Sequence, residues 1–310
     1  MMPKRSRHLL AWVLVCVLSA PAASWAQKHS DWENIGNRDI TKGSWNFYSI
    51  EKEIRLGRTL AAHVEATSHV FRDRFVRFYL DDLVQRLARN SDARLPFIVR
   101  VIDSGELNAF ALPGGYLFVN TGLILEAQTE AELAGILAHE IAHVTARHGT
   151  KQATKSTIFQ WATLPLLFLG GPAGYGIQQG LGLAVPMTLL KFQRNAEREA
   201  DFLGLQYIYR AGYDPVALID FLERLNDTEG RLAKLFSTHP MNTDRIQRAQ
   251  KAIAAVLPPR EDYVVSTSRF DQVQRYLERL QRVSAIYRFS AEGEPQLRRR
   301  SGETGKEDEE

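Results

Sequence analysis

Two histidines and a glutamate stand within five residues of one another in His139-Glu140-Ile-Ala-His143. Four residues of α-helix turn through roughly 400°, so His139 and His143 project from one helix face, a turn apart. Two imidazoles placed in this way can bind one metal ion, and the adjacent carboxylate can take a proton from a water bound to that metal. The spacing therefore predicts a hydrolytic zinc site with His139 and His143 as ligands and Glu140 as general base.

These side chains need a stable helix, and the surrounding segment 129–149 has the features of one. Thr129 and Glu132 form a capping-box pattern, and Gly149 is a natural stop. The apolar residues between them recur at helical spacing in a run rich in alanine. A chance pattern would normally lie on a solvated helix. In this apolar helix, two imidazoles and a carboxylate need partners, which favours the metal site.

A catalytic zinc usually has three protein ligands, so a third must come from elsewhere. The extended motif H-E-x-x-H-x-x-G-x-x-H is excluded because Ala146 and Gly149 stand where glycine and histidine are required. His148 follows His143 by five residues, roughly 140° round a continuous helix. We therefore expect the His148 side chain to point away from the metal.

A glutamate from a later helix is the remaining option. The segment 194–210 reads as a helix and carries Glu197 and Asp201 four residues apart, on one face. Glu197 is the best candidate for the third ligand, and Asp201 could orient a ligand histidine from behind. Two acids at this spacing also commonly form a solvated face. Glu199 is the rival ligand, but its direction differs from that of Glu197 by about 200°.

Residues 1–26 have the layout of a secretory signal peptide. Three basic residues precede the apolar run 9–18, and Ser24-Trp25-Ala26 offers a cleavage site. An uncleaved anchor and a lipid on Cys16 are the alternatives. Cleavage removes the only cysteine, which suits a bacterial periplasm. It also removes the three basic residues that account for the net charge of +3, and a mature chain near neutrality argues against nucleic acid as a partner.

The rest of the chain predicts an α+β fold, mostly helical, with a small sheet. Residues 27–48 form an N-terminal arm, 49–257 the main domain with helices from 49 and at 74–89, 258–290 a C-terminal helix, and 291–310 a charged disordered tail. Segments 96–102 and 116–120 read as strands separated by a Pro-Gly-Gly turn. A plain hairpin explains this arrangement. The functional alternative is that 116–120 is a sheet edge over the metal helix, where an extended peptide can add as a strand.

The segment 158–190 is the most apolar part of the mature chain, but glycines and prolines interrupt it repeatedly. It cannot supply an uninterrupted membrane span, so we interpret it as a glycine-rich helical hairpin or mobile flap, or else a buried core loop. If exposed, it would contact the outer membrane or its assembly machinery, a partner or an unfolded client.

Several ordered motifs resemble one known family. His139-Glu-Ile-Ala-His143, Asn195-Ala-Glu-Arg-Glu-Ala-Asp201 and Ser237-Thr-His-Pro240 with Arg245, preceded by Asn108-Ala-Phe-Ala and Pro113-Gly-Gly115, are similar to the BepA- and HtpX-like zinc metallopeptidases of family 48. The similarity covers roughly residues 49–257. It implies a zincin-like (gluzincin) domain binding one Zn²⁺, whose sheet edge lies over the metal helix.

The resemblance also implies roles for individual residues. His139, His143 and Glu197 are then the zinc ligands, Glu140 is the general base, and Asp201 supports a ligand from the second layer. The family pattern places His239 near the metal, where it would stabilise the oxyanion or occlude the zinc in a resting state. Arg245 is expected close by. Unlike membrane-embedded relatives, this chain has no spanning helix after the signal peptide, and only one helix and a tail follow the domain.

The sequence thus predicts a periplasmic zinc endopeptidase. Because backbone pairing at a sheet edge selects little by sequence, unfolded or misassembled envelope proteins are the expected substrates. The rival hypothesis is a chaperone-like assembly factor whose protease site is plugged and mostly latent. An exopeptidase is a third hypothesis, although no pocket for a free terminus can be read from the chain.

Overall fold

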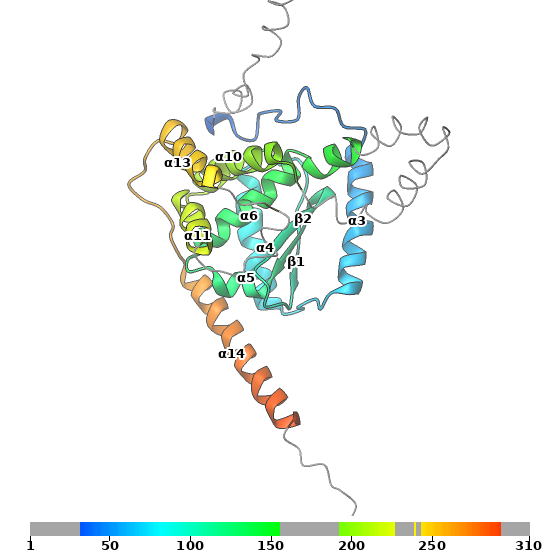
Figure 1. Cartoon of the computed structure of the whole chain (residues 1–310), viewed down its shortest axis with the longest axis vertical. Helices are drawn as coiled ribbons and strands as arrows, with labels where there is room; N and C mark the ends of the chain where they lie inside the picture. The colour runs from blue at the N-terminus through cyan, green and yellow to red at the C-terminus, as the bar shows by residue number, and fades with distance from the viewer. Residues whose placement is uncertain (1–31, 156–191, 227–238, 240–242, 293–310) are drawn as a thin grey trace, which may run out of the picture.

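In the computed structural model, which describes residues 32–155, 192–226, 239 and 243–292, a small mixed sheet is surrounded by helices (Figure 1). Strand β1 (Ile98–Ile102) runs parallel to β3 (Tyr116–Asn120), and β2 (Ala109–Leu112) runs antiparallel to β3. The strand order is β1-β3-β2. Every residue of β3 is buried, because neighbouring strands flank it on both sides and helices cover both faces.

The prediction that 116–120 is the sheet edge over the metal helix is wrong. This strand is central, and the edge strand beside the metal helix is β2. A plain hairpin between the two predicted strands is also wrong, because β1 and β3 are parallel. The hairpin instead joins β2 to β3 through the 3-10 turn η2 (Pro113–Gly115), in which Gly114 and Gly115 have φ of 77° and 89°.

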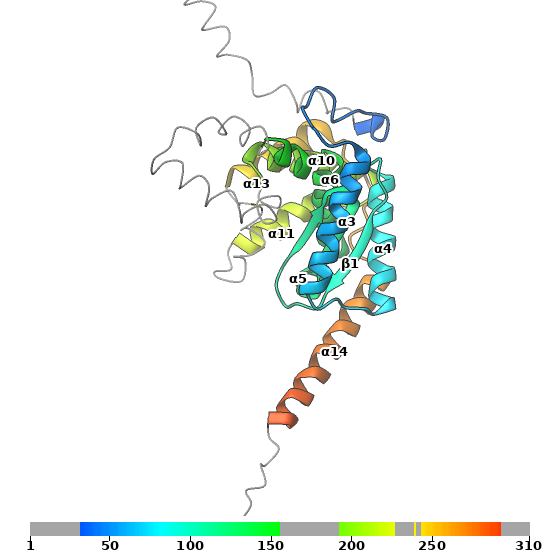
Figure 2. The ribbon, with the colours of Figure 1, turned by 90° about the vertical axis from the view of Figure 1, so that its right-hand side faces the viewer.

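Helices cover both faces of the sheet. Helix α3 (Ile50–Thr67) packs on the face that carries Phe118, whereas α4 (Arg74–Arg89) and α6 (Glu130–Thr145) pack on the face that carries Leu117 and Val119. Figure 2 shows α3 lying along the sheet. It can approach η2 closely because Gly57 has no side chain. A Cβ at this position would lie only 1.7 Å from the Pro113 carbonyl oxygen.

Helix α6 is enclosed by other elements, and all of its residues are buried. Helices α10 (Arg194–Arg210), α11 (Val216–Asn226) and α13 (Thr243–Val256) form a layer beside it, and the short α5 (Thr121–Glu126) follows β3. The expected helices at 74–89 and 194–210 have these bounds in the structure. The mostly helical α+β fold is therefore confirmed.

The N-terminal segment 32–48 crosses the outside of this helical layer (Figure 1). It contains the 3-10 turn η1 (Trp32–Asn34), and the Trp32 ring packs edge-on against Tyr209 with centroids 5.1 Å apart. The Arg38 guanidinium forms a buried ion pair with Asp92 at 2.6 Å. Asn46 Nδ2 donates to Thr150 Oγ1 at 2.8 Å. These contacts attach the segment to the main body at several points.

Helix α14 (Ser268–Glu292) leaves the body at the opposite end. Its first turns bury Phe270, Val273 and Leu277 against the core beside α4 and α5, and the remainder projects outward. Among the described residues, no helix combines the length and the apolar character that a membrane crossing requires. The predicted signal peptide, the segment 158–190 and residues 293–310 of the predicted tail lie outside the described residues.

Candidate metal centre

Helix α6 begins with the predicted cap, in a modified form. Thr129 Oγ1 accepts a hydrogen bond from the Glu132 amide at 3.2 Å. The Glu132 carboxylate accepts one from the Gln128 amide at 2.7 Å, instead of from the N-cap amide, and also pairs with Arg224 at 2.6 Å. These bonds fix the start of the helix, and therefore the direction in which its histidines point three turns later.

A glycine lets α10 pack directly against the backbone of α6. A Cβ at Gly204 would lie 3.1 Å from the His139 nitrogen and 3.2 Å from its Cα. At this crossing, the N-terminal half of α10 places Glu197 and Asp201 beside the two histidines of α6. Both acids are buried. The predicted shared face of Glu197 and Asp201 is thus turned towards α6 rather than towards solvent.

Four buried side chains converge to form a candidate metal centre. They are His139, His143, Glu197 and His239, and one nitrogen or oxygen from each lies within 4.8 Å of all the others. The Nε2 atoms of His139 and His143 are 3.0 Å apart. Glu197 oxygens lie 3.6 Å from His139 Nε2 and 3.5 Å from His143 Nε2.

These distances suit a tetrahedral zinc ion. Ligands at about 2.0–2.1 Å from the metal, in tetrahedral directions, would be about 3.3 Å from one another. The separations among His139, His143 and Glu197 range from 3.0 to 3.6 Å. Neutral imidazoles and a carboxylate are also ligand types that zinc prefers. The donor set therefore fits the metal that the sequence predicts.

His239 joins this cluster from a different part of the chain. Its Nδ1 lies 3.3 Å from His139 Nε2 and 3.0 Å from Glu197 Oε1, and its Nε2 lies 3.3 Å from Glu140 Oε1. The ring therefore stands between the donor atoms and the predicted general base. His239 therefore lies beside the other candidate metal ligands, as its motif led us to expect.

Asp201 and Arg245 support the cluster from behind. The Asp201 carboxylate lies 3.0 Å from His139 Nδ1, a close contact without the geometry of a straight hydrogen bond. Arg245 on α13 donates to both Asp201 oxygens, at 2.9 and 2.7 Å. Its third nitrogen lies 3.2 Å from Glu197 and donates to the His239 carbonyl at 3.3 Å. One guanidinium thus fixes three parts of the site.

Glu140 is held by the edge strand. Its Oε2 accepts a hydrogen bond from the Ala111 amide of β2 at 3.0 Å. A cavity of about 30 Å³ lies beside Glu140 and His139, and Leu218, Leu222 and other side chains line it. A buried water needs roughly 10–15 Å³ on this measure, so the cavity can hold one or two water molecules next to the carboxylate.

Burial and neighbouring charges separate the proton affinities within the site. Burial lowers the pKa of His139, but the carboxylates of Asp201 and Glu197 outweigh burial and raise that pKa to about 10. Burial holds the pKa of His143 well below its usual value, and it raises the pKa of Glu140. Burial also tends to raise the pKa of Glu197, yet electrostatic interactions and hydrogen bonds with the surrounding imidazoles hold that pKa well below its usual value.

The expectation that His148 points away from the cluster is only partly right. His148 is not one of the converging donors, but its Nδ1 lies 2.9 Å from His143 Nδ1. Helix α6 ends at Thr145, and Arg147 has a left-handed φ of 57°, so the chain turns before His148. Glu199, the rival ligand, bonds to His148 at 3.1 Å instead of entering the cluster.

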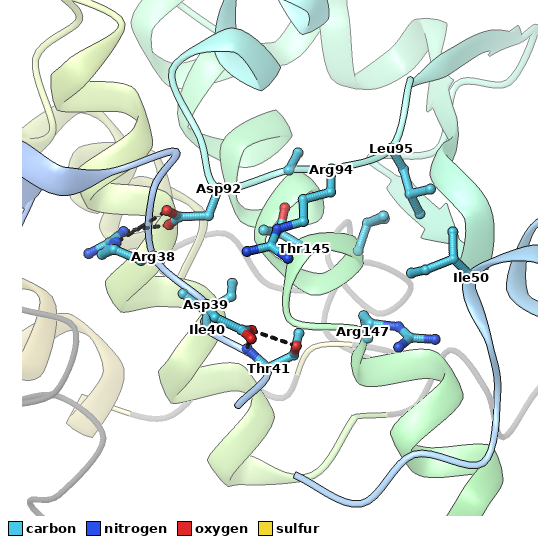
Figure 3. A pocket seen from close by; sticks show the side chains of 12 residues that line it. Arg38, Asp39, Ile40, Thr41, Ile50, Asp92, Arg94, Leu95, Thr145 and Arg147 are labelled. Carbon is cyan, nitrogen blue, oxygen red and sulfur yellow. Dashed lines mark hydrogen bonds and ion pairs between the residues drawn. The ribbon is translucent and has the colours of Figure 1, made fainter. Parts of the chain in front are cut away.

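A larger cavity of about 240 Å³ lies at the C-terminal end of α6 (Figure 3). Its walls come from the N-terminal segment, the loop before β1 and the last turn of α6. Arg38 and Asp92 form one side and Ile50 and Leu95 another. The described residues around it include none of the four converging donors. We therefore place the chemistry at the smaller cavity beside Glu140.

Fold and donor set together define a metallopeptidase of the H-E-x-x-H type, with a glutamate on a second helix completing the site. The chain belongs to peptidase family M48, whose profile matches residues 77–253. The putative beta-barrel assembly-enhancing protease of Vibrio cholerae serotype O1 is 33% identical over 253 residues, which are 77% of this chain and 52% of the relative.

Two further relatives extend the comparison. The beta-barrel assembly-enhancing protease of Escherichia coli K12 is 27% identical over 74% of this chain and 50% of its own length. The mitochondrial metalloendopeptidase OMA1 of Schizosaccharomyces pombe is 32% identical over 59% of this chain and 55% of its own length. The chain spans about half the length of the curated relatives it matches.

Proposed function

We propose that the protein is a zinc-dependent endopeptidase of the bacterial periplasm that cleaves unfolded or misassembled envelope proteins. The observation that carries this proposal is the arrangement around Glu140, whose carboxylate lies beside both the four-donor cluster and a water-sized cavity. The names of the relatives, which include beta-barrel assembly-enhancing proteases and metalloendopeptidases, support the reaction class and a role in outer-membrane assembly.

The chain's own residues divide the work of peptide hydrolysis. His139, His143 and Glu197 would hold the zinc ion, which supplies Lewis-acid activation of a water and of the scissile carbonyl. Glu140 accepts the proton of the attacking water and passes it to the leaving nitrogen. Burial raises the pKa of Glu140, which makes this carboxylate a stronger base than an exposed one.

Strand β2 is the natural place for an extended substrate. The Asn120 amide donates to the Asn108 carbonyl, so by alternation the backbone groups of Ala109 and Ala111 point away from β3. The Ala111 amide is bonded to Glu140, which lies at the same edge. A peptide pairing with β2 would therefore pass close to the general base, with little dependence on its sequence.

Replacing Glu140 by glutamine tests the mechanism. The amide keeps the size of the side chain but cannot act as the base, so cleavage of casein or of a denatured outer-membrane protein should fall at least about 100-fold. Zinc content should stay at one ion per chain. The matched control is Glu223→Gln on the exposed face of α11, which should leave the rate unchanged. A Glu140→Gln enzyme that keeps zinc and cleaves at the wild-type rate contradicts the proposal.

The chaperone-like hypothesis draws on the position of His239 between Glu140 and the other donors. Under that hypothesis, Glu140→Gln restores envelope integrity in a deletion strain as well as wild type does. We expect it to fail instead. If His239 also covers the ion at rest, His239→Ala should increase casein cleavage. For the endopeptidase, we also propose that the segment 158–190 makes peripheral contact with the outer membrane or its assembly machinery.

A further inference from the structure

Two side chains behind His143, His148 and Glu199, have no role in the metal binding or general-base chemistry described above. His148 Nδ1 lies 2.9 Å from His143 Nδ1, and His148 Nε2 lies 3.1 Å from a Glu199 oxygen. His148 is only 5% exposed. The atoms therefore form an unbroken line from a carboxylate through one imidazole to the ring of another.

The surrounding structure fixes both rings. Phe192 stacks on His143 with centroids 4.0 Å apart and planes inclined by 16°, which restricts rotation of the ring. The left-handed turn at Arg147 brings His148 back beside His143, where a continuous helix would carry it away. Glu199 stands on α10 two residues after Glu197, so the same helix contributes to the front and the back of the site.

With both imidazoles neutral, one arrangement of protons satisfies both contacts in this line. The Glu199 carboxylate is an acceptor, so His148 Nε2 carries a proton and donates it. In the neutral imidazole, His148 Nδ1 is then an acceptor, and its partner His143 Nδ1 must carry a proton. The opposite assignment sets a nitrogen lone pair against the Glu199 carboxylate at 3.1 Å. His143 Nε2 is therefore unprotonated, and its lone pair is directed at the cluster, where His139 Nε2 lies 3.0 Å away.

We propose that Glu199 and His148 are positioning residues that fix His143 as the Nδ1–H tautomer and hold its Nε2 ready for the metal. This inference rests on the proposed function for its zinc ion. It makes the two ligand histidines of α6 unequal, because Asp201 lies directly beside His139, whereas a neutral imidazole stands between His143 and its carboxylate. Residues that support ligands in this way typically change metal affinity about 10- to 100-fold when they are lost.

A pair of variants separates hydrogen bonding from packing at this position. His148→Gln offers a carbonyl oxygen to the His143 Nδ1–H, whereas His148→Met has similar length and volume but no comparable acceptor. We expect the Met variant to bind zinc about 10- to 100-fold more weakly than wild type, and the Gln variant to stay within about threefold. Zinc affinity is measured on the full chain by competition with a chelating indicator.

The same comparison at Glu199 guards against a folding defect. Glu199→Gln keeps an oxygen acceptor for His148, and Glu199→Met removes it, so only the Met variant should lose affinity. Thermal unfolding of each metal-free variant shows whether it is folded. If Gln and Met variants weaken zinc binding equally at both positions, the residues only fill space and the proposal is overturned. Unchanged affinity in the Met variants overturns it as well.

Nitrogen NMR of the zinc-loaded protein reads the tautomers directly. The expected signals are a protonated Nδ1 on His143, an unprotonated Nδ1 on His148 and a protonated Nε2 on His148. A protonated Nδ1 on His148 overturns the proposal. These signals require bound zinc but do not depend on whether the protein cleaves peptides. If Glu140→Gln abolishes cleavage while His148→Met binds zinc normally, the proposed protease function is supported and the positioning role of His148 and Glu199 is overturned. If wild type binds no zinc, the proposed function itself fails.

Discussion

Adding one methyl group at Gly204 should disturb the metal site from outside it. A Cβ at this position would approach the backbone of His139 and Ala138 at 3.1 to 3.4 Å, closer than ordinary van der Waals contact. Backbone atoms cannot rotate out of the way as a side chain can, so α10 must shift from α6 by a few tenths of an ångström. Glu197 and Asp201 move with α10, and the separation of Glu197 from the two histidines increases.

The expected magnitude follows from two opposing effects. Replacing glycine by alanine inside a helix stabilises it by about 1 kcal/mol. Overpacking of a tight contact costs about 1–3 kcal/mol. We therefore expect Gly204→Ala to lower the free energy of unfolding of the metal-free protein by about 0–2 kcal/mol. Zinc affinity should fall about tenfold or more, because the ligand positions change although no ligand is removed.

Urea unfolding and zinc competition together test this prediction. Gly135→Ala is the matched control, because its Cβ would press on the Leu218 side chain of α11 at 2.8 Å and leave the contact between α6 and α10 unchanged. The control should alter stability but not zinc affinity. A Gly204→Ala protein that gains about 1 kcal/mol and binds zinc as wild type does would refute the close approach of the two helices.

Two further predictions concern charge. The pKa of His139 is raised to about 10 in the metal-free fold, so protonation of this histidine stabilises the fold. The stabilisation is complete below pH 6.5, the pKa of His139 in the unfolded chain, and is lost as the pH rises towards 10. His143 is already neutral, so zinc binding at pH 7.5 should release about one proton, measurable by calorimetry in buffers of different ionisation enthalpy. Separately, Arg38→Ala leaves the buried Asp92 carboxylate without its positive partner, although the Gly36 amide and the Tyr207 hydroxyl still donate to it. This change should cost about 3 kcal/mol in urea unfolding, whereas Arg248→Ala at an exposed pair should cost less than about 0.5 kcal/mol.

The sequence was most informative where local signals agreed with one another. Helix α10 has a polar start and an apolar continuation, and its predicted bounds match the structure. In α6, the cap at Thr129 and the spacing of the two histidines predicted the direction of their side chains. Both features depend on residues within two or three turns, which helical geometry determines.

Prediction failed where distant parts of the chain decide the outcome. Strand β2 has four residues, two of them alanine, and it forms because β3 offers an antiparallel edge that no local pattern reveals. The error at His148 arose from continuing α6 to Gly149, although the helix ends at Thr145 and a left-handed Arg147 follows. Arginine gives no signal for such a conformation. The contact of His148 with Glu199 spans 51 residues and could not be inferred from either segment alone.

The donors of the metal centre lie far apart along the chain, so an incompletely folded chain cannot assemble the zinc site. His139 and His239 are separated by 100 residues, and Glu197 reaches the histidines only when α10 packs on α6. A chain that has formed α6 alone offers two imidazoles and no carboxylate ligand, so it holds zinc weakly. Hydrolytic capacity therefore arises only with the complete tertiary structure. A newly made copy cannot cut its unfolded neighbours, even though unfolded chains are the substrates that we propose for the mature enzyme.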